Sequence, residues 1–100
     1  MLWAVICIDK PGTSAAREEL LKVHREYLTT KEDIIFFSGP LQSDDASQAL
    51  GSLFVVNVPG RKEAQAYIDA EPFNKAGIFA NVRIFRMRKG RFQPQLADRL

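Results

Sequence analysis

The chain opens on the stretch Leu2-Trp3-Ala4-Val5-Ile6-Cys7-Ile8, which decides how its fold is interpreted. The stretch is short, apolar and rich in β-branched residues, so it predicts a buried strand. Strand alternation divides it into two faces, one with Leu2, Ala4, Ile6 and Ile8 and the other with Trp3, Val5, Cys7 and Asp9. Because both faces are largely apolar, each of them needs a covering layer.

The rest of the chain predicts three more strands and two helices. Turn residues 9–12 end the first strand, and a helix follows over residues 17–28, capped by the hydroxyl of Thr13 or Ser14. Strands are expected at residues 34–37, 53–58 and 82–87, a shorter helix at 61–70 and one helical turn at 74–79. The turn residues Ser38-Gly39-Pro40 are expected to stop the second strand.

The order β-α-β-β-α-β is the split-βαβ pattern of ferredoxin-like folds. This α+β architecture has a four-stranded antiparallel sheet with both helices on one face. We expect one domain over residues 1–90 and a C-terminal tail over residues 91–100 that forms at most a loose terminal helix. Because the second apolar face of the sheet stays open, we expect a homodimer in which two open sheet faces pack together.

The composition describes one small globular domain. The 100 residues are 46% hydrophobic and 26% charged, which is too apolar for a disordered chain. A net charge of +2 is too small to indicate a polyanionic partner such as a nucleic acid. No apolar run approaches the roughly 18 residues of a membrane helix, and no signal-peptide pattern opens the chain. The single cysteine, Cys7, excludes an internal disulfide. Taken together, these observations favour a cytoplasmic protein with no membrane partner.

The helix expected at residues 17–28 holds the most informative side chains. Its apolar stripe consists of Ala16, Leu20, Leu21, Val23, Tyr27 and Leu28, and its solvated side consists of Glu18, Glu19, Lys22, Arg25 and Glu26. His24 falls near the middle of the stripe, about 40° from Leu20, and Arg17 lies close to the same line. Inward polar groups need partners, and such breaks in pattern concentrate at functional sites. The alternative is a core histidine that is simply hydrogen-bonded.

The expected topology restricts which acids can reach these two side chains. Both helices run in the same direction, so Glu71, at the end of the second helix, is expected near His24, with Asp69 as the second candidate. Asp9 lies about 15 Å from His24 along the first helix at 1.5 Å per residue, and it is better placed for Arg17. A carboxylate on one ring nitrogen fixes the tautomer and leaves the other nitrogen to accept a proton, as a general base requires.

Other kinds of site are not favoured. One histidine and one cysteine do not supply a metal site, and no glycine-rich phosphate loop is present. Cys7 is interpreted as an inert core thiol, unless its face of the sheet lines a pocket. The basic run comprises Arg83, Arg86, Arg88, Lys89 and Arg91. Because the strand at 53–58 lacks the basic-Gly-aromatic signature of RNA-recognition sheets, we interpret this run as an edge strand protected by charge.

A series of short motifs runs through the chain. The series consists of a first strand ending in Asp9, the pair Arg17 and His24, then Gly39-Pro40, Gly51-Ser52, Glu71-Pro72-Phe73 and Ala76-Gly77. In order and spacing it resembles the YCII-like (YciI-type) family of small proteins over residues 1–90. The chain departs from that family at Glu71, where the family has aspartate. The resemblance implies a ferredoxin-like fold that dimerises into an α/β barrel-like assembly, with an active site built on a histidine–acid pair.

The resemblance also implies a type of chemistry, since one branch of the family is linked to dehydrochlorination of a chlorinated hydroxyhydroquinone and related dimeric folds act on muconolactones. We therefore expect an enzyme without a cofactor that performs an elimination, dehydrochlorination or isomerisation on a small molecule. His24 is the expected acid or base, oriented by Glu71 or Asp69. Arg17 is expected to hold an anionic group or to pair with Asp9, and Ser52 to donate to the substrate. The alternative function is a non-catalytic dimeric ligand-binding or interaction module.

Overall fold

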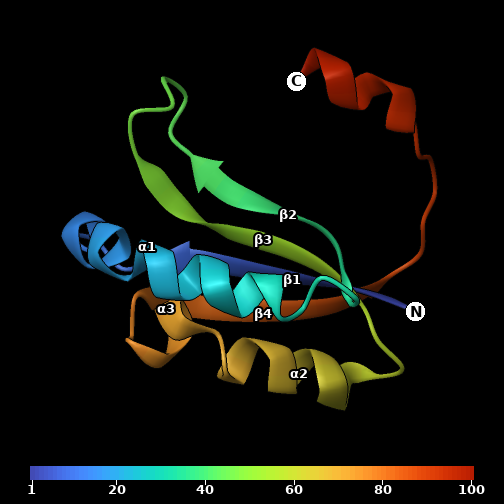
Figure 1. Cartoon of the computed structure of the whole chain (residues 1–100), viewed down its shortest axis with the longest axis horizontal. Coiled ribbons are helices and arrows are strands. Elements are labelled where there is room, and N and C mark those ends of the chain that lie inside the picture. The colour runs from blue at the N-terminus through green and yellow to red at the C-terminus, as the bar shows by residue number, and fades with distance from the viewer.

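One four-stranded antiparallel sheet carries all the α-helices of the chain on one face (Figure 1). The computed structural model describes residues 1–100. Its elements are β1 (Leu2–Asp9), α1 (Ser14–Thr29), β2 (Ile35–Gln42), β3 (Ala49–Asn57), α2 (Arg61–Asp69), α3 (Pro72–Lys75), β4 (Phe79–Met87) and a 3-10 helix, η1 (Pro94–Arg99). The strand order is β2-β3-β1-β4, with every neighbouring pair antiparallel. The ferredoxin-like α+β fold expected from the sequence is thus confirmed. Because β1 and β3 are antiparallel, the helices that follow them, α1 and α2, run in opposite directions (Figure 1). The expectation that both helices run in the same direction was therefore wrong.

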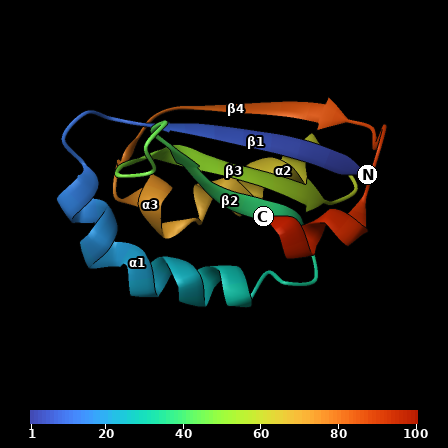
Figure 2. The ribbon, with the colours of Figure 1, turned by 90° about the horizontal axis from the view of Figure 1, so that it is seen from above.

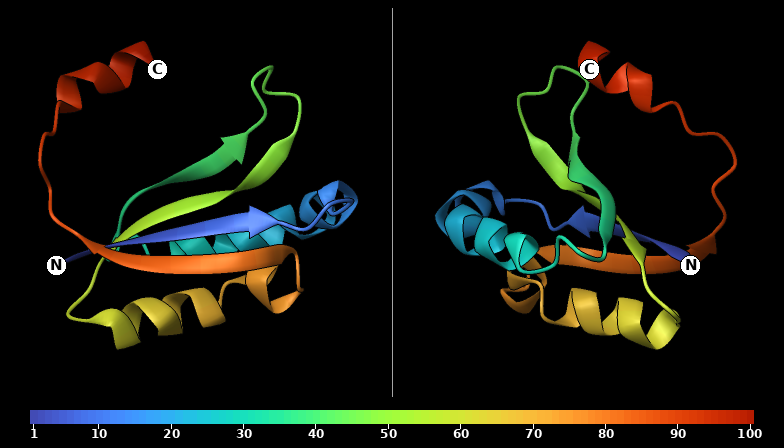
Figure 3. Two further views of the ribbon diagram at one scale, coloured as in Figure 1. Left: turned by 180° about the vertical axis from the view of Figure 1, so that it is seen from behind. Right: turned by 45° about the vertical axis from the view of Figure 1, so that its right-hand side comes forward.

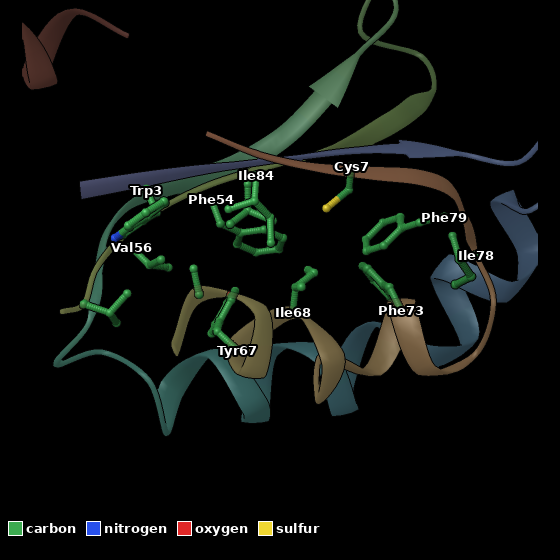
Figure 4. Close-up of a cluster of buried hydrophobic side chains, with 13 residues drawn as sticks. Trp3, Cys7, Phe54, Val56, Tyr67, Ile68, Phe73, Ile78, Phe79 and Ile84 are labelled. Carbon is green, nitrogen blue, oxygen red and sulfur yellow. The ribbon is translucent and has the colours of Figure 1, made fainter. Parts of the chain in front are cut away.

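The hydrophobic core lies between the sheet and the two helices α2 and α3 (Figure 4). On β1 the residues Trp3, Val5 and Cys7 are buried, as the alternation predicts. The register of β3 places Val56, Phe54 and Ser52 opposite these three residues. Helix α2 adds Ala64, Tyr67 and Ile68 from below, and α3 adds Phe73. Each large side chain buried here contributes about 1.5–3 kcal/mol, so the central strands and α2 are the rigid part of the molecule.

The other face of the sheet carries no helix (Figure 2). Four large apolar side chains are 40–56% exposed on it: Ile8, Phe37, Phe85 and Met87. The C-terminal tail leaves β4 and stands away from the sheet in both views of Figure 3, with Phe92 touching Phe36 at a ring-centroid distance of 5.5 Å. The open face is therefore available to a second copy, and the homodimer stays a prediction. No helix of the chain combines the length and the apolarity that crossing a membrane requires.

Two expectations about the helix α1 were wrong. Thr13 is its N-cap residue, but the Thr13 hydroxyl donates to the carbonyl oxygen of Lys10 and caps no backbone N–H. Val23 is 49% exposed and lies outside the buried stripe, whereas Leu20, Leu21, Tyr27 and Leu28 pack against the core. No residue of α1 is fully buried, so this helix covers the sheet less closely than α2 does.

The second strand is also longer than expected. The residues Ser38-Gly39-Pro40 were expected to stop it, but β2 continues through them to Gln42 and pairs with β3 along this whole length. Pro40 is tolerated in β2 because β2 is an edge strand. No further strand lies on its outer side, so no hydrogen bond between strands is lost there when the backbone N–H is missing. β4 forms the other edge of the sheet. This confirms the edge strand that we predicted from its basic residues.

Candidate functional site

A cavity of about 520 Å³ opens between α1 and the half of the sheet formed by β2 and β3. In Figure 2 these are neighbouring elements, with α1 outermost. Helix α1 lines the cavity with Arg17, Leu21, His24 and Leu28, and the sheet lines it with Ser38, Ser52 and Phe54. The volume falls in the usual range for small-ligand sites, roughly 300–1,000 Å³, and the lining mixes apolar side chains with a few polar groups.

The side chain of His24 is paired with a buried acid in this cavity wall. Its Nδ1 lies 2.5 Å from Oε1 of Glu71, a residue with 0% exposed surface. The other carboxylate oxygen, Oε2, accepts the backbone N–H groups of Phe73 at 3.1 Å and Asn74 at 3.2 Å. A carboxylate with these partners is satisfied as an anion, so we infer that Nδ1 donates its proton to Glu71. Nε2 makes no hydrogen bond within the chain and is the ring nitrogen left for a ligand.

The local sequence explains how Glu71 reaches this position. It precedes Pro72, which disfavours the helical region, and its backbone is extended at φ −69° and ψ 128°. Pro72 then opens α3, with Glu71 as the N-cap residue. Gly77, at φ 75°, turns the chain after α3 in the left-handed region that glycine tolerates best. The motif Glu71-Pro72-Phe73 therefore builds a short helix that is capped by the same carboxylate that contacts His24.

Phe73 supports both polar side chains of α1 from below. Its ring stacks on the imidazole of His24 with a centroid distance of 4.1 Å and an interplanar angle of 8°. The guanidinium carbon of Arg17 lies 4.6 Å from the centroid of the same ring. Planar groups held against an aromatic face lose rotational freedom, so Phe73 fixes the orientation of both side chains.

Arg17 is held by a second polar network beside the histidine. Its Nε donates to Oδ2 of Asp9 at 2.6 Å, and its Nη2 donates to the carbonyl oxygen of Gly51 at 2.8 Å and to Oγ of Ser52 at 2.7 Å. A side chain at position 51 has no room, because a Cβ there would lie 2.1 Å from the carbonyl oxygen of Cys7. Nη1 makes no hydrogen bond within the chain, so one nitrogen of this cavity-lining guanidinium stays free.

Two residues considered from the sequence lie away from the ring. Asp69, the second candidate for orienting His24, is exposed and accepts a hydrogen bond from Gln65 within α2. Glu71 is therefore the only acid in ion-pair distance of the histidine. Cys7 has 0% exposed surface, and burial, assisted by the nearby carboxylates of Glu71 and Asp9, raises the pKa of its thiol to about 12. The thiol is thus protonated and closed off from the cavity.

Two charged residues line the cavity in addition to those expected from the sequence. Glu18 and Arg25 are exposed, as expected for the solvated side of the helix, and both also line the cavity. They belong to a second stripe of α1 at spacings of four, three, four and three residues, formed by Ser14, Glu18, Leu21, Arg25 and Leu28. This spacing is visible in the sequence. The sequence does not show that α1 has two neighbours, the core on one side and the cavity on the other.

Comparison with known proteins places these features in a family. A family model described as the YCII-related domain matches residues 1–88. No curated protein matches. The solved 5-chloro-2-hydroxyhydroquinone dehydrochlorinase TftG from Burkholderia phenoliruptrix, in complex with 2,5-dihydroxybenzoquinone, is similar at 26% identity and a TM-score of 0.83, over 90% of this chain and 96% of that one.

A more distant similarity links the chain to the protein At3g17210 from Arabidopsis thaliana, at 16% identity and a TM-score of 0.48, over 92% of this chain and 97% of that one. The family match spans every element of the sheet and all three α-helices, and it ends before the C-terminal tail. It includes both members of the histidine–glutamate pair and the whole Arg17 network. The resemblance seen in the sequence is confirmed, and the chain belongs to the YCII-related domain family.

Proposed function

We propose that this protein is a cofactor-independent acid–base catalyst acting on a small oxygenated, aromatic-derived compound, with His24 as the proton-transfer group. The observation that carries the proposal is that the two nitrogens of one imidazole ring have different partners. Nδ1 is held by the buried carboxylate of Glu71, and Nε2 has no partner in a cavity of about 520 Å³. This is the arrangement that a general base needs, because the orienting group and the substrate use different ring nitrogens.

The other polar groups of the cavity supply substrate-binding roles. The free Nη1 of Arg17 is a charged donor for an oxygen that gains negative charge as the proton leaves. Ser52 accepts a hydrogen bond from Arg17 through its hydroxyl oxygen. The hydroxyl hydrogen of Ser52 is therefore free to be donated to the substrate. Asp9 serves to fix the guanidinium rather than to contact the ligand.

The proposed reaction balances without an external oxidant or reductant. Nε2 takes a proton from carbon or oxygen of the substrate, and the electron pair of the broken bond forms a new double bond. In an elimination from a chlorinated hydroxyhydroquinone, Nε2 first takes a hydroxyl proton and the imidazolium returns it at the chlorine-bearing carbon, which gives the keto tautomer. Nε2 then takes the proton of the second hydroxyl group, chloride departs with the electron pair of the C–Cl bond, and the imidazolium releases its proton to solvent. In an isomerisation the imidazolium returns the proton at another carbon. The similarity to TftG, whose name describes a dehydrochlorinase, favours the elimination.

A direct test uses 5-chloro-2-hydroxyhydroquinone under anaerobic conditions with chloride release as the readout. We expect turnover by the unaltered protein and a loss of roughly 10²–10⁴-fold in kcat for His24→Asn with the fold intact by circular dichroism. The exposed change Asp69→Asn is the matched control and should leave the rate unchanged. A His24→Asn variant that releases chloride at the normal rate would refute the proposal. Binding of the compound without turnover would instead support the non-catalytic ligand-binding module.

A further inference from the structure

We propose that Arg25 is a specificity-determining residue that selects substrates with an anionic substituent, such as a carboxylate, placed beyond His24 toward the C-terminal end of α1. This inference rests on the proposed function for the location of the reacting atom. It concerns binding and needs no turnover for its test.

Arg25 lies on the cavity side of α1, between two apolar lining residues. Leu21 precedes it by four residues and Leu28 follows it by three, so the three side chains share one helical face. Across the cavity, the lining residues Ser38, Gly39 and Pro40 of β2 are all uncharged. The facing wall therefore offers Arg25 no charge partner.

No acid of the helix neutralises Arg25 either. The positions three and four residues away hold Leu21, Lys22, Leu28 and Thr29, none of which is acidic. Glu18, the acid that shares its cavity face, lies seven residues away, about 10.5 Å along the helix at 1.5 Å per residue. The two ion pairs of the chain are formed by Arg17 with Asp9 and by His24 with Glu71. A cation without a partner in the lining of a cavity is available to a ligand.

Arg17 and Arg25 occupy opposite sides of the histidine and are not equivalent. Arg17 is 11% exposed and already donates to Asp9, Gly51 and Ser52, so it contributes one free nitrogen near the deep wall. Arg25 is exposed, makes no side-chain hydrogen bond, and retains the full fork of donors that matches a carboxylate. A substrate that spans both cations presents an uncharged oxygen to Arg17 and its permanent anionic group to Arg25, with the reacting atom at His24 between them.

The test compares two probes of nearly equal shape and different charge, 2,5-dihydroxybenzoate and 2,5-dihydroxybenzamide, by isothermal titration calorimetry. We expect the unaltered protein to bind the benzoate about tenfold or more tightly than the amide, the preference that a charge-assisted hydrogen bond provides. Arg25→Gln should reduce this preference to less than threefold, and Arg25→Lys should retain most of it. Lys22→Gln removes the same charge from the solvated side of the same helix, outside the cavity, and should leave the preference unchanged.

Four results would overturn the inference, and the first three concern the preference between the two probes. These are equal affinity for both probes in the unaltered protein, an undiminished preference in Arg25→Gln, or an equal loss in Lys22→Gln, which would indicate a general field effect. Failure to bind either probe at 10 mM would also overturn it. The outcome is separable from the proposed function, because charge selectivity lost in Arg25→Gln stands without turnover, and chloride release by a protein without charge selectivity refutes only the role of Arg25.

Discussion

At the scale of single residues, the carboxylate of Glu71 joins His24 to the start of α3. One oxygen of its carboxylate meets His24, and the other caps α3 through the N–H groups of Phe73 and Asn74. An N-cap aspartate would satisfy the same two N–H groups with a shorter side chain. The extra methylene of glutamate is what lets a capping residue extend to the ring.

Glu71→Asp should therefore lose one of these two contacts. We expect the free energy of unfolding to fall by about 1–3 kcal/mol, since a buried donor or acceptor is left without its partner. Urea titration monitored by circular dichroism measures the change, with the exposed Asp69→Asn as the matched control. A stability equal to that of the unaltered protein would show that the shorter carboxylate reaches both sites.

Cys7 should be chemically silent in the folded protein. Its pKa is raised to about 12 by burial, with the carboxylates of Glu71 and Asp9 adding to the effect. Iodoacetamide at pH 8 is expected to label Cys7 only after denaturation, as measured by mass spectrometry. Rapid labelling of the native protein would contradict the burial of this residue.

The raised pKa of Cys7 also affects the pH dependence of the free energy of unfolding. Below pH 9 the thiol is protonated in both the folded and the unfolded state, so its contribution to stability is complete. Between pH 9 and about 12 the thiol ionises in the unfolded state only, so the free energy of unfolding falls as pH rises through that window.

At the scale of elements, the sequence predicted α1 and the inward direction of Arg17 and His24, because one apolar stripe is enough to orient a helix. It did not predict that Arg25 lines the cavity, because a single periodicity describes one packed face. Helix α1 has two neighbours, the core on one side and the cavity on the other. The length of β2 was missed for a related reason. Proline ends a strand only where its N–H is needed, and the sequence alone does not say which strand is at the edge.

The β2–β3 connection holds the one non-glycine residue with a positive φ, Ala46 at 60°. The left-handed region costs a residue with a Cβ roughly 1–2 kcal/mol. Ala46→Gly should therefore stabilise the protein by about 1 kcal/mol, measured by urea titration. The neighbouring residue Ser47 lines the cavity, so binding of 2,5-dihydroxybenzoate to the variant shows whether this loop also shapes the site. A loss of stability would show that the gain is outweighed by the freedom of glycine in the unfolded chain.

At the scale of the whole molecule, the open sheet face predicts a homodimer. Its exposed apolar residues include Phe37, which is 56% exposed, and Phe85, which is 44% exposed. Phe37→Glu places a charge in the proposed interface and should convert the dimer to a monomer in sedimentation velocity at micromolar concentration. Val23→Glu is the matched control, because Val23 is 49% exposed on α1, on the other side of the sheet, and this change should leave the dimer intact. A monomeric unaltered protein would contradict the prediction.

The fold brings the single histidine to a cavity, with Nδ1 held by Glu71 and Nε2 free of partners within the chain. Because the chain contains a single histidine, long-range ¹H–¹⁵N correlation of histidine-labelled protein reports on His24 alone. For the neutral ring we predict a proton on Nδ1 and none on Nε2, and a loss of this single-tautomer pattern in Glu71→Gln. A proton on Nε2 with Nδ1 bare would contradict this arrangement, because the ring nitrogen without a partner in the chain would then be a donor and could not act as a base.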